Sequence, residues 1–322
     1  MDGTINNVNV DPRIRHYGRF YGLSDEGPSD RPLVAVTGSC QAGSIRRLLD
    51  STGAADAVLI PPVHELTADD VPHLRALLSR ADILVAQPVR DGYRWLPIGW
   101  REQARMLPAH AAVVRYPVLR WAGLHPWQVI VRPPSDTSAT PPLVPYHDLR
   151  ILLAAAREPA FASRSGIVLD DAPLRPSPAG LRAAAAASVA ALRAREDAHG
   201  TIPVADLLAA APRWHTINHP DNATLLAVAR RVAAAAGIGG EVREPGWGML
   251  GGARARIDDD AAAALGVEAD PPGPEWTVDG KAVDADELRD AHLSWYRRHP
   301  DAVEEGLRRH ADLIGTLTGA AA

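Results

Sequence analysis

Cysteine and lysine are nearly absent from this sequence. Cys40 is the only cysteine in 322 residues, so the chain forms no internal disulfide, and no cluster of cysteines and histidines has the spacing of a structural zinc site. Lys281 is the only lysine among 34 basic residues. This arginine excess accompanies alanine runs at 183–187 and 233–236, a combination typical of a GC-rich genome. Arginine counts therefore say little about function, and no metal site is predicted.

Long hydrophobic runs are also lacking. No uncharged apolar stretch approaches the roughly 20 residues of a membrane span, and residues 1–30 lack the apolar segment of a signal peptide. The formal net charge of −5 disfavours a nucleic acid or an anionic membrane surface as the main partner. We therefore expect a soluble, cytoplasmic protein that acts on small molecules. The sequence leaves its oligomeric state open.

The pattern of apolar segments predicts an α/β fold. Short apolar runs separated by helical segments are typical of a doubly wound, mainly parallel sheet with helices on both faces. The predicted strands cover residues 33–37, 57–60, 83–86 and 111–114. In open sheets of this class, ligands bind beyond the carboxyl ends of the strands. Four polar residues follow predicted strand ends and so fall at the expected site: Cys40, His64, Gln87 and Asp91.

Three regions are expected along the chain. Residues 1–30 form an N-terminal arm packed on the main body, and residues 31–240 form the α/β catalytic domain. Residues 241–322 form a C-terminal, mostly helical extension, in which Asp279 and Gly280 turn a hairpin. Further helices are expected at 147–160, 179–197, 224–236 and, as a final pair, 284–318.

Cys40 is the candidate nucleophile. It stands where the first strand ends at Gly38 and a helix begins, so unpaired backbone N–H groups and the helix dipole favour its thiolate. The alternative is a small buried side chain, since free cysteines are among the most buried residues.

Two histidines qualify as the base that a cysteine nucleophile needs. His64 follows the second strand, at the same edge of the sheet as Cys40. If the backbone is extended there, Glu65 beside it points elsewhere. His219 lies before a late helix, from which the base often arrives in hydrolases whose nucleophile follows the first strand. The alternatives are a packing histidine at 64 and a turn with a helix cap at 218–221. The choice of base stays open.

Other polar groups complete the predicted site. A strand-to-helix turn leaves backbone amides able to meet developing charge, and nearby side chains can add donors. The candidates for oxyanion or positioning roles are Ser39, Gln41, Gln87 and Asn218.

Arginine and tryptophan gather between residues 90 and 132. A tryptophan beside an arginine can hold an adenine ring or a sugar face while the guanidinium takes a phosphate. The alternative is a rim of half-buried aromatic side chains. Candidates for substrate or cofactor binding, including a histidine in the following turn, are Asp91, Tyr93, Arg94, His125 and Trp127.

Five parts of the sequence carry a resemblance to a known family: residues 34–41, His64, 81–88 with Asp91 and Tyr93, 117–126 and 216–220. In this order they resemble the WcbI family of polysaccharide-biosynthesis proteins, and the resemblance extends over about residues 16–240. It implies a coenzyme A-dependent acetyltransferase, in which Cys40 takes the family's cysteine position and His64 looks like its histidine partner. The family usually has asparagine before the cysteine, whereas this chain has Ser39, so an oxyanion role of that amide does not carry over.

The arrangement is also similar to that of GDSL-type esterases, which have a nucleophile after the first strand and a histidine before a late helix. Here cysteine stands in place of serine, and Thr216 stands where an aspartate is expected before His219. We predict an acyltransferase that moves an acyl group from acyl-coenzyme A through Cys40 to a sugar or small metabolite. A cysteine-dependent esterase or thioesterase is the alternative, and a non-catalytic glycan- or nucleotide-binding protein is the third.

Overall fold

The computed structural model describes residues 11–23, 30–159, 161 and 175–318, which form two compact units. Unit 1 comprises the described residues up to Val118 together with 193–204 and 222–249. Unit 2 comprises the described residues of 119–192, 205–221 and the chain from Leu250 onward. These boundaries differ from the predicted division at residue 240, because 119–192 and 205–221 pack with the C-terminal part of the chain.

Unit 1 is built on a four-stranded parallel sheet, which confirms the predicted fold class. Its strands are β1 (Leu33–Thr37), β2 (Asp56–Val58), β3 (Ile83–Ala86) and β4 (Ala112–Arg115), in the order β2-β1-β3-β4. The chain leaves β1 toward one side to form β2 and then crosses to the other side to form β3. The topological switch point, where such sheets bind their ligands, therefore lies between the carboxyl ends of β1 and β3.

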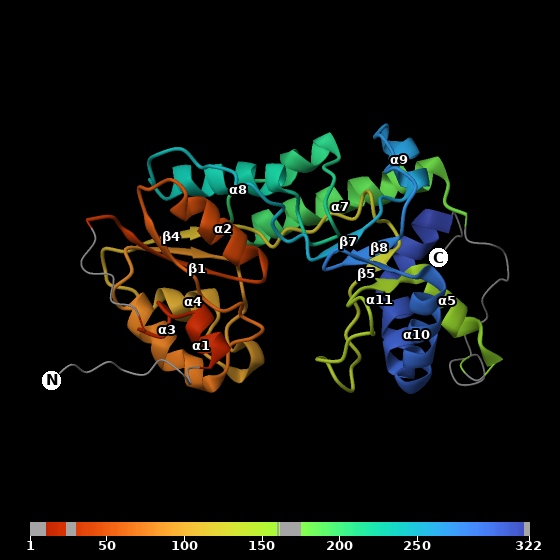
Figure 1. Ribbon diagram of the computed structural model, residues 1–322, viewed down its shortest axis with the longest axis horizontal. Coiled ribbons are helices and arrows are strands. Elements are labelled where there is room, and N and C mark those ends of the chain that lie inside the picture. Colours follow the sequence, from red (N-terminus) through yellow and green to blue (C-terminus); the bar gives the residue numbers. More distant parts are fainter. Residues whose placement is uncertain (1–10, 24–29, 160, 162–174, 319–322) are drawn as a thin grey trace. The chain divides into compact units, whose positions relative to one another are not determined.

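Helices cover both faces of this sheet, as predicted (Figure 1). They are α1 (Pro12–His16), α2 (Gln41–Asp50), α3 (Val71–Leu78), α4 (Trp100–Ala104) and α8 (Asn222–Ala235). α2 and α8 pack against each other on one face, and α1, α3 and α4 lie on the other. On this second face, Ala35, Leu84 and Ala86 of the sheet form a core with Phe20 and with Leu74 of α3. Alternation along the strands points the intervening residues toward α2.

The described part of the N-terminal arm is anchored on unit 1 by one carboxylate. Arg13 donates hydrogen bonds of 3.0 and 2.9 Å to Asp70, and the Tyr21 hydroxyl donates one of 2.6 Å. Asp70 also accepts from the Thr67 backbone N–H at 2.8 Å, within the capping box ahead of α3. Burial opposes the charge, but these bonds lower the pKa of Asp70 far below its ordinary value. Residues 1–10 and 24–29 of the predicted arm lie outside the described residues.

Unit 2 contains the predicted helical C-terminal region and the predicted hairpin. Helices α5, α10 and α11 pack together around a core that includes Trp127, Leu152, Trp295 and Tyr296. Its helices are α5 (Leu149–Arg157), α7 (Pro178–His199, through Leu192 in this unit), α9 (Asp259–Leu265), α10 (Ala285–Arg298) and α11 (Pro300–Thr318). Its strands are β5 (Gln128–Val129), β6 (His147–Asp148), β7 (Ala253–Ala255), β8 (Trp276–Val278) and β9 (Lys281–Val283). They form the antiparallel sheets β5-β6 and β7-β8-β9.

Among the described residues, no helix is both long enough and apolar enough to pass through a membrane. No group of three or more histidine, cysteine, aspartate or glutamate side chains among them is arranged to hold a metal ion.

Candidate active site

Cys40 lies at the switch point of the unit 1 sheet. β1 ends at Thr37, and Cys40 is the N-cap residue of α2, with backbone angles already in the right-handed helical region. Its side chain makes no capping hydrogen bond and is partly buried. The cysteine therefore lies where the strand order predicted a ligand site.

Burial raises the pKa of the Cys40 thiol above its ordinary value. Hydrogen bonds with the Ser39 side chain and the Gln41 backbone N–H favour the thiolate, and the nearby Glu65 carboxylate disfavours it. The backbone N–H groups at the helix start favour the thiolate, as predicted, but burial has the larger effect on the pKa of Cys40. The thiol needs a base to remove its proton at neutral pH.

A buried amide network fixes the loop that carries Cys40. The side-chain carbonyl of Gln87, which follows β3, accepts the Ser39 backbone N–H at 2.7 Å, and its amide donates to the Gln41 side-chain oxygen at 2.9 Å. A Cβ atom added to Gly38, whose φ is +157°, would lie 2.6 Å from Gln87 Oε1. Glycine is therefore required for this approach. The Ser39 N–H is engaged within this network, and the side chains of Gln41 and Gln87 are hydrogen-bonded to each other.

His64 belongs to the same unit and the same end of the sheet as Cys40. The backbone N–H of Val63 donates to the Gly38 carbonyl at 2.9 Å, which joins the loop after β2 to the loop after β1. The His64 side chain is 50% exposed, and its Nε2 lies 3.7 Å from a carboxylate oxygen of Glu65. Arg94 donates to the His64 backbone carbonyl. The extended backbone that would direct Glu65 elsewhere is not formed, because the chain turns at residues 63–65.

His219 and Asn218 lie in unit 2. The Tyr146 hydroxyl donates to Asn218 Oδ1 at 2.8 Å and lies 3.5 Å from His219 Nε2, while Thr216 donates to the same hydroxyl at 3.0 Å. Burial, with the neighbouring His215, lowers the pKa of His219 to about 4. Its imidazole is therefore neutral at physiological pH and a weak base.

The loop after β3, whose Arg94 contacts the His64 backbone, exposes a tryptophan. Gly92, Arg94 and Trp95 all have positive φ angles, and the Trp95 side chain is 98% exposed. The Glu102 carboxylate holds the two ends of this loop together by accepting the backbone N–H groups of Gly92 at 3.0 Å and Gly99 at 2.9 Å. Of the ligand candidates predicted here, Asp91 and Arg94 are exposed and Tyr93 is half-buried.

The other tryptophans between residues 90 and 132 are less exposed than Trp95. Trp100 has the guanidinium groups of Arg101 and Arg115 at 4.7 and 4.6 Å from its ring. Trp121 and Trp127 are buried in unit 2. Among the described tryptophans of this stretch, Trp95 is the exposed one, and Trp100 is half-buried.

A cavity of about 400 Å³ lies within unit 2. Two of the predicted binding residues, His125 and Trp127, line it. His125 is buried, and its Nε2 lies 2.9 Å from the Trp214 carbonyl oxygen. Tyr146 and Trp276 form a stacked pair in the wall, with ring centres 5.4 Å apart. The cavity therefore offers aromatic surface to a ligand.

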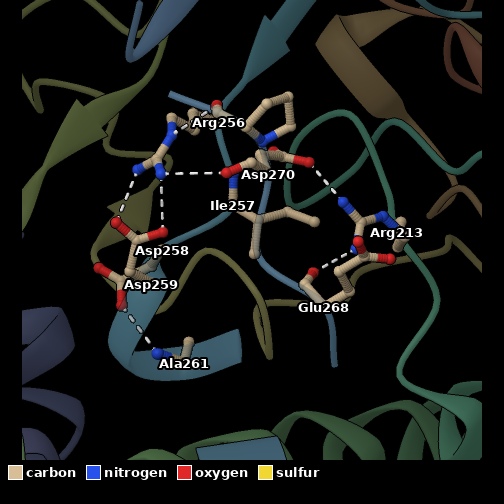
Figure 2. Close-up of polar contacts among 9 residues, drawn as sticks. Arg213, Arg256, Ile257, Asp258, Asp259, Ala261, Glu268 and Asp270 are labelled. Carbon is tan, nitrogen blue, oxygen red and sulfur yellow. Dashed lines mark hydrogen bonds and ion pairs between the residues drawn. The ribbon is translucent and has the colours of Figure 1, made fainter. Parts of the chain in front are cut away.

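Carboxylates dominate the charge of this cavity. Among the described residues, its lining contains the acids Asp148, Asp258, Asp259, Asp260 and Glu275 and the bases Arg150 and Arg256. Both bases are already paired, Arg150 with Asp148 at 2.6 Å and Arg256 with Asp259 at 2.8 Å. Figure 2 shows the neighbouring network, in which Asp258 caps α9 through the Ala261 N–H and Asp270 joins Arg213 to the Ile257 N–H. An anionic ligand would meet a net negative lining.

Glu65 and Tyr116 lie near Cys40 but were not predicted as site residues. Glu65 could have been found only by knowing that the chain turns at His64. Tyr116 follows β4, and the rule that placed Cys40 and Gln87 at strand ends applies to it equally.

Comparison with known proteins gives one family. The family model described as "Polysaccharide biosynthesis enzyme WcbI" matches residues 33–241. No curated protein matches the chain. A solved structure of WcbI, described as a novel polysaccharide biosynthesis enzyme in its native form without a disulfide bond between coenzyme A and a cysteine of that protein, is similar with a TM-score of 0.70. The two sequences are 19% identical, and the match covers 89% of this chain and 98% of the other, which shows a common fold.

Proposed function

Because the chain belongs to the WcbI family of polysaccharide biosynthesis enzymes, as its motifs predicted, we propose that it transfers an acyl group from acyl-coenzyme A to a saccharide, with Cys40 as the nucleophile. One observation carries this proposal. Cys40 starts α2 at the switch point of the sheet, and the loop bearing His64 is hydrogen-bonded to the loop bearing Cys40. A nucleophile and a candidate base thus share one edge of unit 1.

Coenzyme A enters the proposal as the acyl donor. The similar WcbI structure is described with reference to coenzyme A and a cysteine of that protein. In this chain, the exposed Trp95 ring offers a face for an adenine, and Arg90 and Arg94 on the same loop offer charge for its phosphates.

In the first half-reaction, His64 takes the proton of the Cys40 thiol, and the thiolate attacks the acyl carbonyl carbon. A bond forms between Sγ and that carbon, the bond from that carbon to the coenzyme A sulfur breaks, and the leaving thiolate receives the proton from His64. One thioester replaces another, so bonds and charges balance.

In the second half-reaction, His64 takes the proton of a saccharide hydroxyl as its oxygen attacks the acyl-enzyme. The new ester bond forms, the bond to Sγ breaks, and the proton returns to the Cys40 sulfur. The raised pKa of the Cys40 thiol favours this return.

The cavity of unit 2 supports a saccharide as the ligand of that unit. Its volume of about 400 Å³ is within the range of small-molecule sites, and the faces of Tyr146 and Trp276 suit the apolar faces of a sugar ring. Carboxylates such as Glu275 accept hydrogen bonds from hydroxyl groups.

Intact-mass spectrometry with acetyl-coenzyme A tests the proposal. We expect one acetyl group on the wild-type chain, its removal on addition of a saccharide acceptor, and no adduct on Cys40→Ala. Absence of an adduct with every acyl-coenzyme A tried, or the same adduct on Cys40→Ala, would refute a Cys40 nucleophile.

A cysteine-dependent thioesterase is the second candidate. The half-exposed His64 favours it, because water reaches this imidazole as readily as a sugar hydroxyl does. Loss of the acetyl group within one turnover, at the same rate with and without a saccharide, would identify the hydrolase.

A further inference from the structure

Tyr116 continues the sheet edge that holds the proposed site. The Gln87 N–H donates to the Thr37 carbonyl at 3.0 Å, and the Tyr116 N–H donates to the Ala86 carbonyl at 3.1 Å. Gly38, Gln87 and Tyr116 therefore form the next row of the parallel ladder across β1, β3 and β4. Ala86 points to the core beneath α3, so alternation directs Tyr116 to the face covered by α2, whose first turn carries Cys40.

The Tyr116 hydroxyl is buried without a hydrogen bond. The side chain is fully buried, and its hydroxyl has no hydrogen-bond partner among the described residues, Cys40 Sγ included. Leaving such a group unsatisfied costs about 1–3 kcal/mol, so an unpartnered buried hydroxyl calls for an explanation.

The charge of a Cys40 thiolate acts on Tyr116. Burial raises the pKa of Tyr116 far above its ordinary value, and a negative charge on the Cys40 sulfur raises it further. The phenol therefore stays protonated at every pH at which the enzyme would work. It is a permanent neutral donor near the sulfur.

The amide groups predicted to stabilise an oxyanion are engaged elsewhere. The Ser39 N–H donates to Gln87, and the Gln87 amide donates to the Gln41 side chain. The backbone N–H groups of Cys40 and Gln41 favour the sulfur anion itself. When Sγ is bonded to the acyl carbon the negative charge lies on the oxygen, and a buried hydroxyl that has no other partner can add to what these N–H groups supply.

We infer that the Tyr116 hydroxyl donates a hydrogen bond to the carbonyl oxygen of the acyl group on Cys40, and so stabilises the oxyanion formed when the thioester is made and broken. This inference rests on the proposed function. Tyr116 is closed to solvent, so a free substrate does not reach its hydroxyl. The carbonyl of an acyl group lies one bond from Sγ, which brings its oxygen into the neighbourhood of the hydroxyl.

Tyr116→Phe isolates the hydroxyl. It removes one oxygen that has no partner, so we expect the temperature of unfolding to stay the same or rise. The acylation of Cys40 by acetyl-coenzyme A should slow by about 10²–10³-fold, as on loss of one oxyanion donor. Alkylation of Cys40 by iodoacetamide forms no oxyanion, and its rate should change by less than about twofold.

Thr37→Val is the matched control. Thr37 is also buried with an unpartnered hydroxyl at this sheet edge, but its ladder position places it on the same face as Ala86, opposite Tyr116. This variant should acylate at the wild-type rate.

Two acyl donors, acetyl-coenzyme A and p-nitrophenyl acetate, distinguish a failure of this inference from a failure of the proposed function. If acetyl-coenzyme A does not acylate the wild type but p-nitrophenyl acetate acylates Cys40, the coenzyme A proposal fails, and Tyr116→Phe should still slow acylation by the ester. Equal acylation rates for wild type and Tyr116→Phe with a donor that does react overturn the inference. An equal loss of acylation rate and alkylation rate in Tyr116→Phe would also overturn the inference, because it would show that the hydroxyl acts on the reactivity of the thiol and not on the oxyanion.

Discussion

The start of α2 and the burial of the thiol shift the pKa of Cys40 in opposite directions. The Gln41 N–H and the Ser39 side chain favour the thiolate, but burial has the larger effect and raises the pKa of Cys40. Reactivity therefore depends on the base. His64 shares unit 1 with the thiol, whereas His219 has a pKa of about 4 in unit 2.

Replacement of His64 by glutamine should slow the acylation of Cys40 by about 10²–10⁴-fold at pH 7, the usual contribution of a general base. His219→Gln should change the rate by less than about threefold, because its low pKa makes the imidazole a weak base. Rapid-quench mass spectrometry with acetyl-coenzyme A measures both rates. A larger loss for His219→Gln would assign the base to His219.

High pH should rescue His64→Gln. Only the thiolate reacts, and the pKa of Cys40 lies above its ordinary value, so the rate should rise about tenfold per pH unit up to that pKa. The wild type should show a shallower rise, because His64 already removes the proton at neutral pH. Parallel profiles for the two proteins would exclude His64 as the base.

At the scale of elements, the junction between β1 and α2 depends on a glycine. Gly38→Ala places a Cβ 2.6 Å from Gln87 Oε1 and should displace the side chain that holds the Ser39 N–H. We expect a loss of about 1–3 kcal/mol in unfolding free energy, as for overpacking, and at least tenfold slower acylation. Gly43→Ala, in the same helix, meets nothing closer than 3.8 Å and should stabilise the protein by up to about 1 kcal/mol at unchanged activity. Equal effects of the two substitutions on activity would contradict this account.

The start of α3 and the N-terminal arm share the Asp70 carboxylate. Asp70→Asn removes the negative charge to which Arg13 and Tyr21 donate hydrogen bonds, and it weakens the capping box with Thr67. The free energy of unfolding at pH 7 should therefore fall by about 3 kcal/mol. The folded pKa of Asp70 is depressed, so its contribution is complete above the unfolded value of about 3.9 and decreases as the pH falls below it.

Urea unfolding at pH 7 and near pH 2 measures this contribution, and the gap between wild type and Asp70→Asn should narrow at the lower pH. Asp69→Asn, at the exposed neighbouring position, should differ from the wild type by less than about 0.5 kcal/mol. A gap that widens toward low pH would contradict the assigned pKa direction.

Elements with strong local patterns could be predicted from the sequence. β1 and β3 have the predicted bounds, and Gly237 ends the helix predicted at 224–236 with a positive φ of 66°. The strands of two or three residues, β5, β6 and β7, were missed because their pairing depends on contacts distant in sequence. The amide network of Gln87 was missed for the same reason, since it depends on sheet register.

At the scale of the whole molecule, fold class and family could be predicted, but the grouping of the chain into units could not. Residues 119–192 contain helical patterns that fit an α/β domain, yet they pack around the core of α5, α10 and α11. That core is assembled from residues more than a hundred positions apart, such as Leu152 and Val303, and no local pattern encodes such pairings. The candidate site was predictable where strand ends alone determine it, at Cys40 and His64.

The net negative charge of the unit 2 cavity lining predicts which sugars the cavity binds more tightly. Both lining arginines are paired, and the acids in the lining outnumber the bases. A sugar phosphate should therefore bind at least tenfold more weakly than glucose. Glucosamine, which carries an ammonium group, should bind at least as tightly as glucose. Ligand-observed NMR titrations at low salt measure these affinities. Glu275→Gln should weaken glucosamine more than glucose, whereas Glu268→Gln, outside the cavity lining, should change neither. Tight binding of glucose 6-phosphate, or equal effects of the two glutamine variants, would show that these carboxylates do not select the ligand.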